Sequence, residues 1–213
     1  MGIEIVKGKQ ATIQFDAQRC IHSRHCVLSH PDVFVPNVKG EWIHPDAQPV
    51  EELIRIGQNC PSGAIRVVSH DGSVSSDSFP IVNTLRVREN GPLAIEAQLQ
   101  IKGVPQASPR ATLCRCGQSQ NKPFCDGSHT AAGFVATGEP STAQFESLVS
   151  RDGPVNVQPL KNGSLRVTGN LEIVSGTGRT CHKVTDAYLC RCGHSKNKPY
   201  CDGSHKAAGF IAE

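Results

Sequence analysis

Residues 113–134 read LCRCGQSQNKPFCDGSHTAAGF, and residues 189–210 read LCRCGHSKNKPYCDGSHKAAGF. Each stretch contains the spacing Cys-x-Cys-x8-Cys-x3-His, and the copies keep every cysteine and histidine of that pattern. A near-identical internal repeat indicates a duplicated structural unit. We therefore predict two equivalent sites, each with three thiols and one imidazole, formed by Cys114, Cys116, Cys125 and His129 and by Cys190, Cys192, Cys201 and His205.

The spacing favours a two-iron site. Cys-x-Cys directs two thiolates to one side of an extended segment, where both reach a single iron. A cysteine and a histidine with three residues between them lie on one face of a helical turn and suit a second iron. The competing interpretation is a structural zinc site, which also uses three thiolates and an imidazole but favours Cys-x2–4-Cys pairs.

Weaker similarity extends the duplication upstream. Asn90–Leu93 and Asn162–Leu165 each read as a turn that enters short strands, because alternating apolar residues follow them. We expect repeats at about 80–137 and 150–213, each an antiparallel β unit, a cysteine-rich loop and a brief helix. That helix would begin near Asp126 or Asp202, which suit an acidic N-cap.

The sequence Cys-Asp-Gly-Ser-His at Cys125–His129 and Cys201–His205 resembles the CDGSH iron-sulfur proteins, also called the NEET family. The resemblance includes the preceding Cys-x-Cys, Ser119 or Ser195, and the proline two residues before the third cysteine. It implies a 2Fe-2S cluster in each site, with three Cys and one His ligand, in a β-rich fold that is usually a homodimer. Two copies in one chain resemble the tandem members of the family. There an intramolecular pseudo-twofold replaces the dimer axis, which implies a monomer.

A different unit precedes the repeats. Cys20-Ile-His-Ser-Arg-His-Cys26 and the later Cys60-Pro61 resemble a divergent monocluster ferredoxin. Ser23 occupies the position of a further thiolate. The resemblance implies a 3Fe-4S cluster on Cys20, Cys26 and Cys60, or a 4Fe-4S cluster whose fourth ligand is Ser23, a neighbouring histidine or water. The alternative is a former ferredoxin fold with three buried free thiols.

The rest of this unit carries local signals. We predict a strand at Ala11–Phe15, a helix at Pro49–Gln58 and a flexible, Ser- and Gly-rich linker at Ser69–Ser78. His22 and His25 would flank the cluster, and Trp42 would lie in the core. The predicted domains are 1–75 and 76–213. The fold class is α+β, a small ferredoxin-like domain followed by a β-rich pseudo-twofold tandem domain.

Composition narrows the function. The chain of 213 residues has a net charge of +3 without a Lys/Arg run, which gives no support for nucleic-acid binding. The sequence shows neither a signal peptide nor an apolar span, so we expect a cytoplasmic protein without membrane attachment. A reducing compartment keeps thiols free, so the ten cysteines favour metal ligation over disulfide bonds. Cys181 would be an unligated thiol on an extended loop of the second repeat.

The sequence contains no catalytic constellation, so we expect an electron carrier, or a donor and sensor of iron-sulfur clusters, rather than an enzyme. Its partners would be redox proteins or cluster-acceptor proteins. A structural zinc module that binds another macromolecule is the alternative. Because the free ring nitrogen of a histidine ligand can take up a proton, the redox potential should depend on pH. Imidazole in place of thiolate should also raise that potential.

Overall fold

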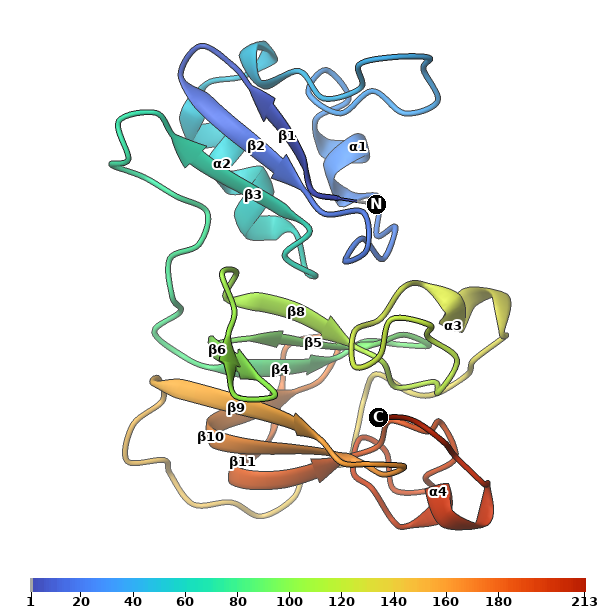
Figure 1. The fold of residues 1–213 in the computed structure, drawn as a ribbon. Helices are drawn as coiled ribbons and strands as arrows, with labels where there is room; N and C mark the ends of the chain where they lie inside the picture. Colours follow the sequence, from blue (N-terminus) through green and yellow to red (C-terminus); the bar gives the residue numbers. More distant parts are fainter. Residues whose placement is uncertain (1) are drawn as a thin grey trace. The chain divides into compact units, whose positions relative to one another are not determined.

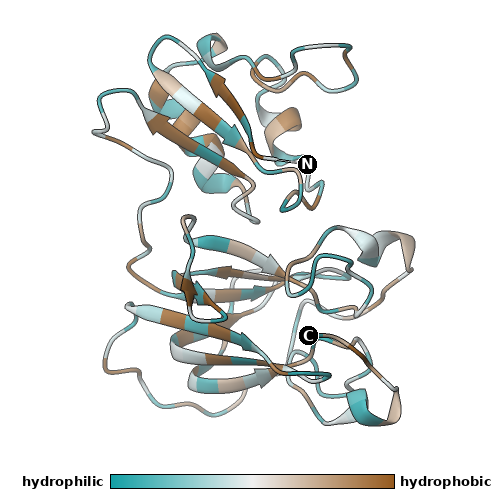
Figure 2. Ribbon diagram, viewed as in Figure 1, coloured by the Kyte–Doolittle hydropathy of each residue, from teal (hydrophilic) through white to brown (hydrophobic). Residues whose placement is uncertain are grey.

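The computed structural model describes residues 2–213 and divides into two units, Met1–Ser78 and Phe79–Glu213. We call them unit 1 and unit 2. The secondary structure is α+β, with sheets in both units and short helices beside them (Figure 1). Apolar residues alternate along most of the strands (Figure 2), as expected for sheets with one face in a core.

Unit 1 is built on a three-stranded antiparallel sheet in the order β1-β2-β3, with α2 packed on it. Its elements are β1 (Glu4–Lys7), β2 (Ala11–Phe15), α1 (His25–Ser29), η1 (Pro45–Ala47), α2 (Val50–Asn59) and β3 (Ile65–Ser69). The strand prediction is confirmed at both ends, and the helix prediction is confirmed to within one residue. Pro49 is the N-cap of α2, and Leu53 and Ile56 of that helix are buried in the core.

The predicted flexible linker at Ser69–Ser78 is wrong. Ser76 is fully buried, and its hydroxyl accepts a hydrogen bond from Val67 N at 2.9 Å. A Cβ on Gly57 of α2 would lie 2.6 Å from the Ser76 Cβ, so the segment packs closely against the helix. Ser- and Gly-rich composition indicates flexibility only where a segment lies in solvent, and this one covers β3. Unit 1 therefore extends to Ser78.

Unit 2 contains an eight-stranded sheet in the order β7-β6-β9-β10-β4-β5-β8, with β11 paired to β10. The first repeat supplies β4 (Thr84–Val87), β5 (Leu93–Glu96), β6 (Gln98–Ile101), β7 (Val104–Pro105), β8 (Arg110–Leu113) and α3 (Ser128–Ala131). The second supplies β9 (Pro154–Pro159), β10 (Leu165–Val174), β11 (Thr180–Leu189) and α4 (Ser204–Ala207). Aliphatic residues from both repeats form one continuous core.

The two repeats exchange strands reciprocally. β6 of the first repeat runs parallel to β9 of the second, with Ile101 opposite Val157. The second half of β10 runs parallel to β4 of the first repeat, with Ile173 opposite Leu85. Ile101 and Ile173 occupy equivalent positions in the repeats, so the two pairings have the same register. Neither repeat completes its part of the sheet without the other.

A bend in each repeat makes this exchange possible. In β10 the pairing register with β11 shifts between Thr168 and Leu171, which marks a bulge around Gly169. Gly169 has a φ of +117°, and a Cβ there would lie 2.4 Å from the Pro154 carbonyl oxygen. In the first repeat the equivalent residue, Ala97, separates β5 from β6. Each bend lets a strand leave its own repeat and join the other.

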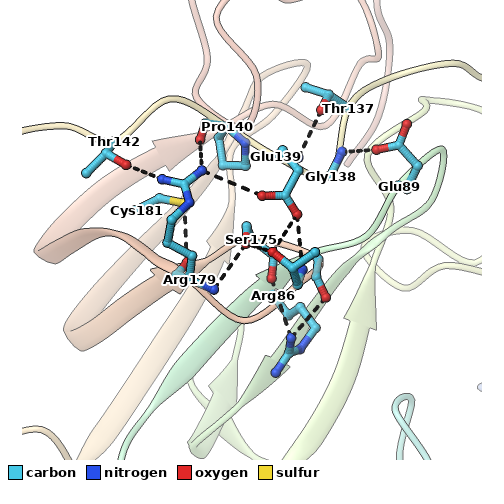
Figure 3. Close-up of polar contacts among 12 residues, drawn as sticks. Arg86, Glu89, Thr137, Gly138, Glu139, Pro140, Thr142, Ser175, Arg179 and Cys181 are labelled. Carbon is cyan, nitrogen blue, oxygen red and sulfur yellow. Dashed lines mark hydrogen bonds and ion pairs between the residues drawn. The ribbon is translucent and has the colours of Figure 1, made fainter.

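The segment between the repeats is fastened to the loop that connects β10 and β11 (Figure 3). Arg179 donates to the Pro140 carbonyl oxygen at 3.1 Å and lies 3.6 Å from a Glu139 carboxylate oxygen. Glu139 also accepts hydrogen bonds from the backbone N and the hydroxyl of Thr177, at 3.1 and 3.0 Å. The extra length of the second repeat in this loop thus anchors the inter-repeat segment.

Cys181 is a buried free thiol, but its predicted position on a loop is wrong. It is the second residue of β11, and its thiol lies 3.4 Å from the Arg179 carbonyl oxygen (Figure 3). The extra loop residues precede it.

The helices within residues 2–213 are all too short or too polar to span a bilayer.

Candidate metal centres

The two cysteine-rich loops lie at the same end of unit 2 and contact each other directly (Figure 1). Cys116 and Cys192 form an isolated antiparallel β-bridge. Gly117 and Gly193, the residues after them, have φ values of +84° and +87°. A Cβ on either glycine would lie 2.5 or 2.6 Å from the carbonyl oxygen of the opposite cysteine. These glycines therefore permit both the turn and the contact between repeats.

In each repeat the predicted ligands form two pairs. The first two thiols, Cys114 with Cys116 and Cys190 with Cys192, have their sulfur atoms 3.8 Å apart. The third cysteine lies 3.3 Å from the histidine Nδ1 in both repeats. Within residues 2–213, no three Cys, His, Asp or Glu gather closely enough to hold one metal ion. A 2Fe-2S cluster fits this donor set, because each of its irons takes one pair of protein ligands.

The three thiols of the first repeat differ in pKa, and so in how readily each loses its proton. The hydrogen bond from Cys116 lowers the pKa of Cys114 to about 6, and the same interaction raises the pKa of Cys116. Burial raises the pKa of Cys125 to about 11. One thiolate is therefore favoured near neutral pH, and a bound cation would have to displace the remaining protons. Burial also lowers the pKa of His129, which keeps its imidazole neutral.

Hydrogen bonds fix the conformation of each loop around its cysteine and histidine side chains. Ser119 donates its hydroxyl proton to the Phe124 carbonyl oxygen at 2.7 Å, and Ser195 donates to that of Tyr200 at 2.6 Å. Both serines connect the Cys-x-Cys segment to the segment that carries the third cysteine. The Lys122–Pro123 and Lys198–Pro199 peptide bonds within the loops are cis.

The N-cap prediction for Asp126 and Asp202 is wrong by one residue. Gly127 and Gly203 are the N-caps of α3 and α4, both with φ of +87°. Asp126 precedes the cap and accepts hydrogen bonds from Ser128 N at 3.0 Å and from Gln120 N at 2.8 Å. The aspartate therefore ties the helix start to the cysteine loop. Burial favours the neutral acid, but these hydrogen bonds outweigh it and lower the pKa of Asp126.

Sequence reasoning missed the arginine between the first two cysteines of each repeat. Arg115 and Arg191 are each only 1% exposed. Arg115 donates to four backbone carbonyl oxygens, those of Arg88, Gly91, Ala136 and Thr137. Burial lowers the pKa of Arg115 to about 10, whereas the negative potential of Cys190, in the other repeat, raises it. Each arginine thus brings positive charge near thiolates of both repeats, which suits a site that binds anionic clusters.

One polar contact distinguishes the second repeat. The Tyr200 hydroxyl lies 2.5 Å from His182 Nδ1, whereas the first repeat has Phe124 in place of Tyr200. Burial raises the pKa of Tyr200 to about 12, so the phenol stays protonated at neutral pH. The two loops are therefore similar in backbone but differ in the polarity of the residue before the third cysteine.

In unit 1 the three predicted thiols influence one another. Burial, followed by weaker repulsion from Cys60, raises the pKa of both Cys20 and Cys26. His22 N donates to the Cys20 sulfur at 3.4 Å, and the Cys60 sulfur lies 3.7 Å from the Ser62 hydroxyl. All three thiols are partly buried, whereas Ser23, His22 and His25 are exposed. Trp42 packs against the core as predicted, although it also reaches solvent.

Comparison with known proteins finds relatives of both units. Residues 90–130 and 162–206 match the family described as "Iron-binding zinc finger CDGSH type", and residues 6–70 match "Divergent 4Fe-4S mono-cluster". The chain is also similar to the "Uncharacterized protein YjdI" of Escherichia coli K12 and of Escherichia coli O157:H7. Each is 32% identical over 66 residues, which are 30% of this chain and 84% of the relative. The chain is thus an iron-sulfur protein of the CDGSH family, a tandem member with an N-terminal divergent mono-cluster domain.

Proposed function

We propose that this chain is an electron carrier with three clusters: a 2Fe-2S cluster in each repeat of unit 2 and a 3Fe-4S or 4Fe-4S cluster in unit 1. It acts without catalysis of its own, as a cytoplasmic monomer with an internal pseudo-dimer. Its partners are redox proteins, and neither nucleic acid nor a membrane takes part. Ten free cysteines suit such a reducing compartment.

The observation that carries the proposal is the matched pairing of donors in both repeats, with thiols 3.8 Å apart and a thiol 3.3 Å from an imidazole. Cys114, Cys116 and Cys125 are buried, whereas His129 is partly exposed. The histidine therefore lies on the solvent side of the thiols. Electrons can enter and leave a cluster held in this way without solvent access to every ligand.

The test is elemental analysis of anaerobically purified protein, combined with electron paramagnetic resonance (EPR) before and after dithionite reduction. We expect about seven irons per chain if unit 1 holds 3Fe-4S, and about eight if it holds 4Fe-4S, with similar amounts of acid-labile sulfide. The visible absorption should bleach on reduction. A colourless protein that contains zinc and no sulfide would instead establish the structural zinc module.

Cluster transfer is the second candidate function, and the exposure of the histidine ligand favours it. A cluster bound through one partly exposed imidazole has its accessible bond on the solvent side. Incubation of the holo protein with an apo-ferredoxin distinguishes the two functions. Transfer of the visible spectrum to the acceptor supports a donor, whereas fast electron exchange with the clusters retained supports a carrier.

A further inference from the structure

The two cysteine-rich loops of unit 2 differ in charge. Residues 113–134 and 189–210 differ at four positions, and at three of them the second loop has the more basic residue. The replacements are Gln118 by His194, Gln120 by Lys196 and Thr130 by Lys206. Every charged residue of the first loop is kept in the second, so the two lysines give the second loop two more positive charges.

The added lysines lie in solvent, close to the predicted ligands. Lys206 follows His205 directly in α4 (Figure 1), and Lys196 and Lys206 are both exposed. Asp202 joins their two segments, because it accepts hydrogen bonds from Lys196 N at 2.8 Å and from Ser204 N, at the start of α4, at 3.0 Å. The two lysines therefore lie on the same part of the surface as the partly exposed His205.

Nearby carboxylates do not remove this difference. Asp202 is repeated in the first loop, so it leaves the difference between the loops unchanged. The segments that the buried arginines bind contribute one charge of each sign in each repeat, from Arg88 and Glu89 in the first and from Lys161 and Glu213 in the second. The second loop therefore keeps its excess of two positive charges.

Both repeats also expose an aliphatic side chain just after the short helix. Val135 is 82% exposed and Ile211 is 81% exposed. Phe210, the residue before Ile211, donates its backbone N–H to the His205 carbonyl oxygen at 3.0 Å, so Ile211 lies one residue from a contact with the ligand's backbone. Apolar residues surrounded by polar and charged ones are typical of protein–protein interfaces. The aliphatic residue is common to both repeats, and the lysines distinguish them.

We propose that the surface formed by Lys196, Lys206 and Ile211, which we call the basic face, docks an electron-carrier protein with an acidic surface. The charge of the second loop matches such a partner, and that of the first does not. Complementary charge speeds the encounter of two proteins and selects the partner. The assignment rests on the proposed function in one respect, that the cluster of the second repeat exchanges electrons.

Docking at the basic face requires only one electron to move. The partner loses one electron and the second cluster gains it, so that one of its two ferric irons becomes ferrous, with no bond formed or broken. A cluster held by three thiolates is anionic and repels an acidic protein. Lysines beside its ligands offset that repulsion where the partner approaches.

The experiment titrates the oxidised holo protein with an acidic flavodoxin at low ionic strength and measures binding by isothermal titration calorimetry. The loss variant combines Lys196→Gln with Lys206→Thr, which are the residues of the first loop at these positions. Binding should weaken by about fivefold or more in this variant, with iron content and reduction potential unchanged. High salt should bring parent and variant together, because exposed charges are then screened.

Two matched variants complete the set. Lys9→Gln with Lys39→Gln removes the same charge from exposed positions of unit 1 and should bind flavodoxin as the parent does. The gain variant, Gln120→Lys with Thr130→Lys, gives the first loop the charge of the second and should strengthen binding by about twofold or more. It tests the basic face even where the loss variant fails to fold.

Stopped-flow kinetics test the electron step separately. Flavodoxin hydroquinone should reduce the loss variant about fivefold more slowly than the parent at low ionic strength. Cytochrome c, which is basic, is the comparison partner, and the reduced loss variant should transfer electrons to it at least as fast as the reduced parent does.

Equal flavodoxin binding by the parent and the loss variant at low salt overturns the basic face. Slower reaction of the loss variant with both flavodoxin and cytochrome c also overturns it, because the substitutions would then act on the cluster. Binding of the parent to phosphatidylglycerol vesicles but not to flavodoxin does so too, since the partner would then be a membrane surface. Intact clusters that take no electron from flavodoxin in any variant overturn the electron-carrier proposal instead, while calorimetry still decides whether the basic face docks it.

Discussion

Single residues decide how closely the two cysteine-rich loops of unit 2 approach each other. Gly117 and Gly193 are needed twice, once for positive φ and once because a carbonyl oxygen occupies the space of a Cβ. Arg115 and Arg191 stabilise the loops through buried hydrogen bonds to backbone carbonyl oxygens. The sequence repeats all four residues, but only the ligands have a recognisable chemical pattern.

Gly193→Ala should destabilise unit 2 more than Gly153→Ala does. Gly153 has a φ of +90°, and no neighbouring atom lies within 4 Å of the place that a Cβ would take. Alanine there costs about 1–2 kcal/mol for the left-handed backbone alone. At Gly193 the clash with the Cys116 carbonyl oxygen adds about 1–3 kcal/mol. Urea unfolding measures both free energies. Equal losses in the two variants would show that the contact between the loops is dispensable.

His205→Cys should lower the reduction potential of the second cluster by on the order of 100 mV, because a thiolate replaces a neutral imidazole. Redox titration followed by EPR measures the potential. His129→Cys is the matched variant and should lower the potential of the first cluster. Unchanged potentials in both variants would mean that the histidines are not ligands.

Elements, rather than residues, account for what the sequence left unpredicted. The cysteine and histidine donors could be predicted because their spacing is local and occurs twice. The exchange of β6 and β10 between repeats could not, because it depends on pairing between residues far apart in the chain, such as Ile101 with Val157. The prediction for Ser69–Ser78 failed for the same reason, since the contacts of this segment with α2 and β3 are tertiary.

Glu172 on β10 forms two ion pairs within unit 2. Its carboxylate is buried, lies 2.7 Å from Arg151 Nε and 3.5 Å from Lys183 Nζ, and these contacts lower the pKa of Glu172 below its ordinary 4.5. The stabilisation is therefore fully present above pH 4.5 and is lost as the pH falls through the folded-state pKa.

Glu172→Gln should lower the free energy of unfolding by about 1–3 kcal/mol at pH 7, because Arg151 and Lys183 lose their charged partner. The difference from the parent should shrink below about pH 4.5. Urea unfolding at several pH values measures it, with Glu146→Gln as the control because that residue of unit 2 is exposed. A difference that stays constant down to about pH 3 would contradict the assignment.

The whole molecule consists of two units, each with its own apolar core. A core of aliphatic residues in each unit provides the condition for independent folding. Unit 1 also contains all three of its predicted thiols, and unit 2 contains both complete repeats. We therefore expect cluster binding in one unit to require no ligand from the other.

Residues 1–78 and 79–213, expressed separately, should each fold and bind iron. The iron contents of the two fragments should add up to that of the full chain, within the error of the assay. Far-ultraviolet circular dichroism checks the folding of each fragment, and EPR checks its clusters. A fragment that folds but loses its iron would show that ligands are shared between the units.

Because the reciprocal strand exchange takes place within one chain, the shared sheet of unit 2 does not depend on protein concentration. A protein assembled from two separate chains falls apart when its concentration drops below the dissociation constant, and its shared sheet opens with it. Here the second partner is always tethered, at an effective concentration set by the connecting segment. Because the two repeats are encoded separately within one chain, their sequences can differ. The second repeat has Tyr200 paired with His182, whereas the first has Phe124 in the equivalent position.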